Sequence, residues 1–109
     1  MAHEKHQSCI DACYTCATSC NHCSTACLTE PDPGSMVDCI KADMDVAQTC
    51  HLAAAAMARG SDYVPQICGF CAEICEYCAE ICDKYDAEHC KKCAQDCRDC
   101  AAECRKMAA

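Results

Sequence analysis

Cysteine is the residue type whose number and spacing set this chain apart, since it fills 18 of 109 positions. Along most of the chain the cysteines follow one another at intervals of three and four residues. Their thiolates are soft ligands, which in proteins select Cu(I), zinc or iron–sulfur clusters. The candidate metal ligands are Cys9, Cys13, Cys16, Cys20, Cys23, Cys27, Cys39, Cys50, Cys68, Cys71, Cys75, Cys78, Cys82, Cys90, Cys93, Cys97, Cys100 and Cys104.

Such intervals place side chains on one face of an α-helix. The inward face of a helix normally carries Leu, Ile or Val, but here it carries thiols. We expect helices at about 3–28, 35–58, 61–82 and 90–104, because the cysteine spacing and the turn residues agree on these bounds. Ser35 is expected to cap the second helix, Gly60 to end it, and Pro65 to lie in the first turn of the third.

Four helices of similar length joined by short loops predict an all-α, antiparallel four-helix bundle with a cysteine-lined core. A length of 109 residues fits one domain spanning residues 1–109. With one Phe and no Trp, an ordinary hydrophobic core would be small. We therefore expect the ions that the sulfurs bind to add to the stability of the folded chain.

The second helix is the exception, because it carries only Cys39 and Cys50. Its inward stripe is completed by residues without a thiol, which are Asp43, Val46, Ala53 or Ala54, and Met57. This wall of the bundle supplies few sulfur ligands, so the metal capacity along it stays open.

Several uses of so many cysteines can be compared. A buried cysteine can act as a small apolar residue, but that role does not account for an in-phase row on every helix. Disulfides within one helix face are strained, and a reducing cytosol disfavours bridges between helices. Iron–sulfur clusters are usually held on loops punctuated by Gly and Pro, and no cysteine here precedes a proline.

Geometry and charge favour Cu(I) among the soft metals. Two metal–sulfur bonds of about 2.3 Å span a little over 4 Å, which a pair of cysteines four residues apart on a helix can accommodate. A Cu(I) ion that replaces a thiol proton leaves the net charge unchanged, whereas a zinc tetrathiolate retains two negative charges. The favoured function is storage of many Cu(I) ions without catalysis. The alternatives are an iron–sulfur or thiol/disulfide redox protein, and a zinc or heavy-metal sequestration protein.

Charge and composition bear on partners and location. The net charge of −8 argues against nucleic acid as a partner. No apolar run is long enough to span a membrane, and the opening residues MAHEKHQS lack the apolar stretch of a signal peptide. We expect a cytosolic protein whose thiols stay reduced.

The cysteine phase resembles that of the bacterial four-helix-bundle copper storage proteins, in particular their cytosolic class. Three stretches carry the resemblance: CxxACxxCxxxCNHC at 9–23, CAEICEYCAEIC at 71–82 and HCKKCAQDCRDCAAEC at 89–104. The resemblance covers nearly the whole chain and implies many Cu(I) ions inside the bundle and a homo-tetramer. A copper chaperone or a copper-dependent enzyme would then be the donor or acceptor.

Up-down topology brings the start of the first helix beside the ends of the second and fourth. Extending the cysteine stripes outward places His6, Met57 and Met107 there, and we expect this end to be the mouth through which copper enters. The alternative is that the two methionines only fill gaps. His3, His22 and His51 lie off the stripes and are expected to be solvated.

The opposite end gathers Cys27, Cys39, Cys82 and Cys90 together with His89 and Asp43. Asp43 is expected either to orient His89 or to bind copper weakly, since a carboxylate is a hard ligand for Cu(I). A capping histidine and a half-exposed aspartate are the alternative.

A row of apolar residues on the third helix precedes the cysteines one by one. Its members are Ile67, Phe70, Ile74, Tyr77 and Ile81. The row either completes the packing of the monomer or forms an interface between copies of the chain, which is the interpretation we favour.

Overall fold

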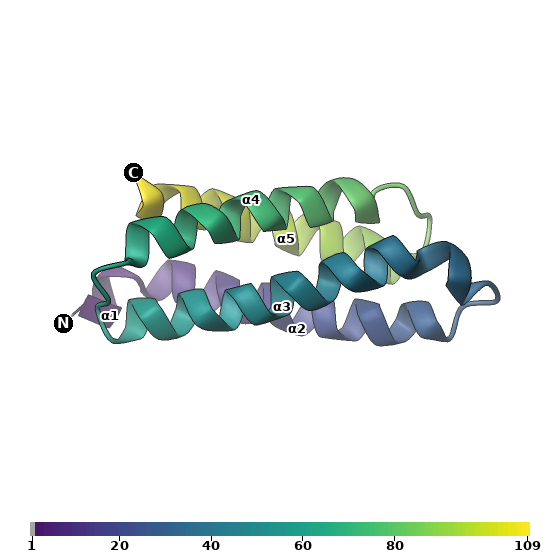
Figure 1. Ribbon diagram of the computed structural model, residues 1–109, viewed down its shortest axis with the longest axis horizontal. Coiled ribbons are helices and arrows are strands. Elements are labelled where there is room, and N and C mark those ends of the chain that lie inside the picture. The colour runs from purple at the N-terminus through teal and green to yellow at the C-terminus, as the bar shows by residue number, and fades with distance from the viewer. Residues whose placement is uncertain (1) are drawn as a thin grey trace.

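The computed structural model describes the backbone of residues 2–109 and the side chains of residues 4–109. Four long helices form an antiparallel bundle about 47 Å long: α2 (Gln7–Leu28), α3 (Val37–Ala58), α4 (Val64–Cys82) and α5 (Glu88–Ala108). A short α1 (Ala2–Lys5) precedes them, and the 3₁₀ turn η1 (Pro33–Met36) leads into α3. Both chain ends and the α3–α4 loop lie at one end of the bundle, and the other two loops lie at the opposite end (Figure 1). The predicted all-α four-helix bundle is confirmed.

The start of the bundle differs from the expectation of one helix over 3–28. The chain turns at His6, whose φ and ψ of −105° and 4° are not helical, so that α1 and α2 are separate. The imidazole Nδ1–H of His6 donates to the carbonyl oxygen of Met57 at 3.3 Å, at the end of α3. This bond across the bundle end favours a bend that a local helical pattern does not predict.

The start of α3 also differs from the expectation. Ser35 does not cap the helix, because α3 begins two residues later and Ser35 lies within η1. The Ser35 hydroxyl donates to the backbone carbonyl of Asp32 at 2.8 Å. Pro33 fixes the backbone for a tight turn, and the serine side chain is used in that turn instead of at the helix start.

The turn predictions for Gly60 and Pro65 are confirmed, whereas α4 begins at Val64, three residues after the expected start at 61. Gly60 has a φ of 64°, the left-handed conformation that ends α3 and that glycine adopts without steric cost. Ser61 precedes α4 and accepts a hydrogen bond from the Tyr63 backbone N–H at 3.1 Å. Pro65 lies in the first turn of α4, and the break before α5 covers residues 83–87.

The core consists of cysteine and alanine rather than of large aliphatic side chains. All the cysteines are buried, none exposing more than 1% of its surface. Alanines such as Ala17, Ala72 and Ala94 pack between the helices and let them approach closely. The inward residues predicted on α3 are also fully buried, and they are Asp43, Val46, Ala53, Ala54 and Met57. Among the described residues, no helix combines the length and apolarity that a bilayer-crossing segment requires.

Candidate metal centre

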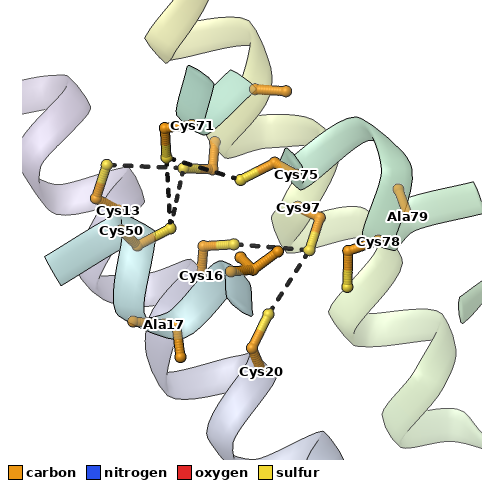
Figure 2. Close-up of a cluster of buried hydrophobic side chains, with 14 of the residues drawn as sticks. Cys13, Cys16, Ala17, Cys20, Cys50, Cys71, Cys75, Cys78, Ala79 and Cys97 are labelled. Atoms are coloured by element: carbon orange, nitrogen blue, oxygen red, sulfur yellow. Dashed lines mark hydrogen bonds between the residues drawn. The ribbon is translucent and has the colours of Figure 1, made fainter. Parts of the chain in front are cut away.

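The cysteine stripes of α2, α3, α4 and α5 face one another along the bundle axis. In the middle of the bundle, Cys20 Sγ of α2 lies 3.5 Å from Cys93 Sγ of α5 and 3.7 Å from Cys97 Sγ. Cys50 of α3 lies 3.8 Å from both Cys71 of α4 and Cys100 of α5. Figure 2 shows the thiols of Cys20, Cys50, Cys71 and Cys97 pointing inward from different helices. The interior is therefore a column of sulfur atoms spaced closely enough to share metal ions.

All the cysteines are free thiols. They gather into groups of four ligand atoms that lie within 4.8 Å of one another. The groups that contain only cysteine include Cys13, Cys71, Cys100 and Cys104; Cys16, Cys50, Cys75 and Cys100; Cys20, Cys78, Cys93 and Cys97; and Cys23, Cys27, Cys39 and Cys90. Because Cys100 belongs to two of them, neighbouring groups run into one another along the axis.

Burial keeps protons on thiols at one end of this column. Desolvation by burial, reinforced by the charge of Cys39, raises the pKa of Cys27 to about 11. Burial also raises the pKa of Cys90 well above its usual range. Such thiols carry their protons at neutral pH, so metal binding at this end must release protons.

Among the described residues, Asp43 is the one fully buried carboxyl group, and it lies inside the column. Its Oδ1 accepts hydrogen bonds from the thiols of Cys93 at 3.2 Å, Cys78 at 3.3 Å and Cys82 at 3.7 Å. Desolvation by burial raises the pKa of Asp43 to about 11, with the neighbouring thiol groups adding to the effect. The folded chain therefore holds this carboxyl group neutral at pH 7.

His89 lies at the loop end of the bundle with its two ring nitrogens facing different surroundings. Nδ1 lies 3.4 Å from Cys23 Sγ and 3.6 Å from Cys90 Sγ. Nε2 donates to Glu30 Oε1 at 2.8 Å, so in the neutral ring Nδ1 carries a lone pair directed at the thiols.

Glu30, not Asp43, is therefore the carboxylate that orients His89, and the expected role of Asp43 in orienting it is wrong. Asp43 instead accepts hydrogen bonds from the thiols of Cys39, Cys78, Cys82 and Cys93. Glu30 was missed because it follows the last turn of α2, where no periodicity marks a residue as inward-facing. Its position at the same bundle end as His89 is the only sequence signal that indicated it.

The three residues proposed to form a copper mouth lie at the end that holds both termini. His6 contacts the Met57 carbonyl, and His6 and Met107 line a surface depression of about 450 Å³ together with Lys5, Ser61 and Val64. Met57 itself is fully buried beneath them, and Met107 is partly buried. Cys9 and Cys104, whose sulfurs are 3.7 Å apart, follow one turn further inside along α2 and α5.

The remaining histidines differ in what surrounds them. His22 and His51 are exposed, as expected, and the ring of His51 packs edge-on against Tyr14 with centroids 6.0 Å apart. His22 also lines a groove of about 430 Å³ that includes His89 and Lys92. The side chain of His3 lies outside the described residues.

A helical bundle lined with free, buried thiols defines a class of protein that takes up soft metal ions. A model of the copper storage protein family matches residues 2–109. The chain belongs to this family, which confirms the resemblance drawn from the cysteine phase. Because members of this family are metal stores, the expectation that the chain is not an enzyme is also met.

Solved structures of similar proteins support the assignment. The Cu(I)-bound copper storage protein BsCsp3 is 45% identical, with a TM-score of 0.91 over 94% of this chain and 97% of that one. A cytosolic copper storage protein from Streptomyces lividans, with five coppers, is 34% identical, with a TM-score of 0.92 over 98% and 94% of the two chains. The cysteine-rich protein YhjQ of Bacillus subtilis, described as uncharacterized, is 45% identical over 67 residues, and this stretch spans 62% of its length.

Proposed function

We propose that this chain stores Cu(I) in the sulfur column of its bundle, with residues 1–109 acting as one storage domain. The observation that carries the proposal is the placement of every cysteine in the buried interior, with neighbouring sulfur atoms 3.3–4.0 Å apart. Thiolates at this spacing can bridge Cu(I) ions in two- or three-coordinate geometry. The Cu(I)-bound relative BsCsp3 supports the same ion for this chain.

The charge balance favours a high capacity for Cu(I). Each Cu(I) that displaces a thiol proton leaves the charge of the column unchanged, so filling does not build up charge in a buried site. With one bridging thiolate pair per ion and each thiolate shared by two ions, we expect roughly one Cu(I) per cysteine. The cytosolic relative from Streptomyces lividans supports a cytosolic location, where thiols stay reduced.

His89 and Asp43 are the proposed ligands besides cysteine. The Nδ1 lone pair of His89 faces three thiols and can complete the coordination of a Cu(I) ion that they hold. Asp43 is a weaker candidate because its carboxyl group is neutral and already accepts hydrogen bonds from thiols. We expect it to bind copper only where neighbouring thiols have lost their protons.

Copper is proposed to enter at the end that carries His6, Met57 and Met107. Imidazole and thioether are ligands from which Cu(I) can pass on to thiolates, and Cys9 lies one turn inward from His6 on the same stripe. His6→Ala and Met107→Ala are expected to slow uptake without changing the final capacity, with His51→Ala as a matched exposed control. Unchanged uptake rates in both variants would place the copper route elsewhere.

Assembly into a homo-tetramer is proposed through the apolar row of α4. Phe70 and Tyr77 expose 54% and 59% of their surface, whereas Ile81 in the same row is buried within the chain. Large aromatic side chains left exposed in a regular row favour contact with another copy of the chain. A copper-delivering protein or a copper-dependent enzyme remains the proposed donor or acceptor.

An anaerobic titration of the reduced protein with Cu(I), against a chromophoric competing chelator, tests the storage function. We expect tight uptake of roughly one ion per cysteine, by a colourless protein. Saturation after only a few ions would refute storage. A brown protein with bound iron would instead support the iron–sulfur alternative.

A further inference from the structure

One of these all-cysteine groups has sulfur spacings close to those of a tetrahedral metal site. Cys23, at the loop end of the bundle, lies 3.9 Å from each of Cys27, Cys39 and Cys90, measured between sulfur atoms. Cys27 and Cys39 are also 3.9 Å apart, and all four sulfurs lie within 4.8 Å of one another. With Zn–S bonds of about 2.3 Å, the sulfurs of a regular zinc tetrathiolate are about 3.8 Å apart. Four edges of the group therefore match this shape.

We propose that Cys23, Cys27, Cys39 and Cys90 form a tetrathiolate site for one divalent ion of the zinc class. This assignment goes beyond Cu(I) storage, although the same thiols also contribute to the copper column. Binding replaces the four thiol protons by one divalent ion, so that four protons are released and a complex of charge −2 remains. No oxidation or reduction is involved.

The surroundings of this group lessen the cost of burying that charge. Cys39 and Cys90 each occupy the third position of a long helix, α3 and α5, where the positive end of the helix dipole favours a thiolate. In the all-cysteine group that contains Cys93 and Cys78, the Asp43 carboxyl oxygen lies 3.2–3.3 Å from both sulfurs and adds an oxygen donor rather than a positive field. In the proposed group the carboxyl contact of Cys39 is longer, with Asp43 Oδ2 at 3.8 Å from its sulfur.

A second group offers a useful comparison because its sulfur spacing is similar but its position is not. Cys13, Cys100 and Cys104 are separated by 3.7–3.9 Å, with Cys71 as the fourth member. None of these residues lies in the first turn of its helix. Loss of Cys104 removes a ligand of this second group and leaves the proposed site intact. Loss of Cys39 removes a ligand of the proposed site and leaves the second group intact.

The site also links three helices around one loop. Cys27 lies in the last turn of α2, Cys39 in the first turn of α3 and Cys90 in the first turn of α5. An ion held there links the end of α2 and the start of α3, which the 29–36 loop connects, to the start of α5. We therefore expect a divalent ion to stabilise the loop end of the bundle when Cu(I) is scarce, and excess Cu(I) to displace it.

The test is an anaerobic titration of the full reduced chain with Co²⁺, whose visible absorption reports a tetrahedral thiolate site. We expect the tetrahedral spectrum to be complete at one Co²⁺ per chain, to be bleached by added Zn²⁺, and to be retained in Cys104→Ala. Cys39→Ala and Cys90→Ala should both lose it, with far-UV circular dichroism showing that at least one of the two is folded. Retention of the spectrum in a folded Cys39→Ala or Cys90→Ala, or its loss in a folded Cys104→Ala, would overturn the assignment.

A Zn²⁺-dependent rise in the midpoint of thermal unfolding gives an independent measurement. It is expected in the wild type and in Cys104→Ala and not in Cys39→Ala. Absence of the rise in the wild type would count against the site. The Cu(I) capacity of the same samples is measured separately. A protein that takes up many Cu(I) ions but shows no Co²⁺ or Zn²⁺ response would refute this site and leave copper storage standing.

Discussion

Replacement of the buried carboxyl group by an amide, Asp43→Asn, tests the electrostatics of the sulfur column directly. Asp43 is fully buried, and burial raises its pKa to about 11. In the unfolded chain the same group ionises at about 3.9. Asparagine has nearly the same shape as the neutral acid and does not titrate, so the substitution removes the proton linkage while preserving the packing.

The sign and size of the effect follow from the two protonation states. Between pH 5 and pH 7 the unfolded chain has lost the Asp43 proton and the folded chain has kept it, so this group lowers the free energy of unfolding as the pH rises. The slope is about 1.4 kcal/mol per pH unit, or about 3 kcal/mol over this interval. The result requires only that the folded pKa lies above 7, and does not depend on how far above.

Urea unfolding of the reduced, metal-free protein at pH 5 and pH 7, followed by far-UV circular dichroism, measures this difference. We expect the stability of Asp43→Asn relative to the wild type to increase by about 3 kcal/mol between the two pH values. Asp45→Asn, at an exposed position on the same helix, should show no such pH dependence. The comparison between variants cancels the titration of all other groups.

A difference between Asp43→Asn and the wild type that stays constant from pH 5 to pH 7 would refute the reasoning. It would mean that the folded chain holds an ionised carboxylate in the column. The thiols that contact Asp43 would then stabilise the charge more strongly than burial penalises it.

Three further predictions concern the turn, the surface and the column. Gly60→Ala should lower the free energy of unfolding by about 1 kcal/mol because φ is 64°, whereas Gly34→Ala, where a methyl group meets only ordinary contacts, should leave it unchanged in the same urea assay. Phe70→Glu should yield monomers in light scattering, and Tyr14→Glu should not; a wild-type monomer would remove the proposed interface. Cys50→Ala should lower the Cu(I) capacity, since its sulfur contacts two others at 3.8 Å; an unchanged capacity in the titration would show that Cys50 is not a ligand.

The positions of the core residues were predictable because helical periodicity alone determines them. Cysteines at intervals of three and four share one face of a helix. When four such helices pack on these faces, the thiols are buried along the axis of the bundle. The same argument placed Val46 and Met57 inside, although neither carries a thiol. Gly60 was predictable for a different reason, since few other residues adopt the backbone conformation that ends α3 there.

The features that were missed depend on contacts between distant parts of the chain. The bend at His6 accompanies a hydrogen bond to a carbonyl of α3, which the local sequence around His6 does not contain. Ser35 could accept a hydrogen bond from a backbone N–H at the start of α3 or donate one to the Asp32 carbonyl, and the turn set by Pro33 favoured the second. Asp43 and His89 were assigned to the same end correctly, but the rotation of each helix about its axis decides which thiols a side chain faces. Glu30 pairs with His89 from a loop, where no repeat constrains the position.

The dominance of cysteine in the core has a consequence for how the protein is recognised. A cysteine sulfur is positioned by a single side-chain torsion, so each sulfur can move between a few staggered positions while the backbone stays in place. Ions can therefore be taken up by small rotations inside the bundle, and the helices need not shift. The outer surface would then be nearly the same in the empty and the filled protein. A partner that binds this surface would have similar affinity for both forms, so information on how much copper is held would have to come from the exchanged ions themselves.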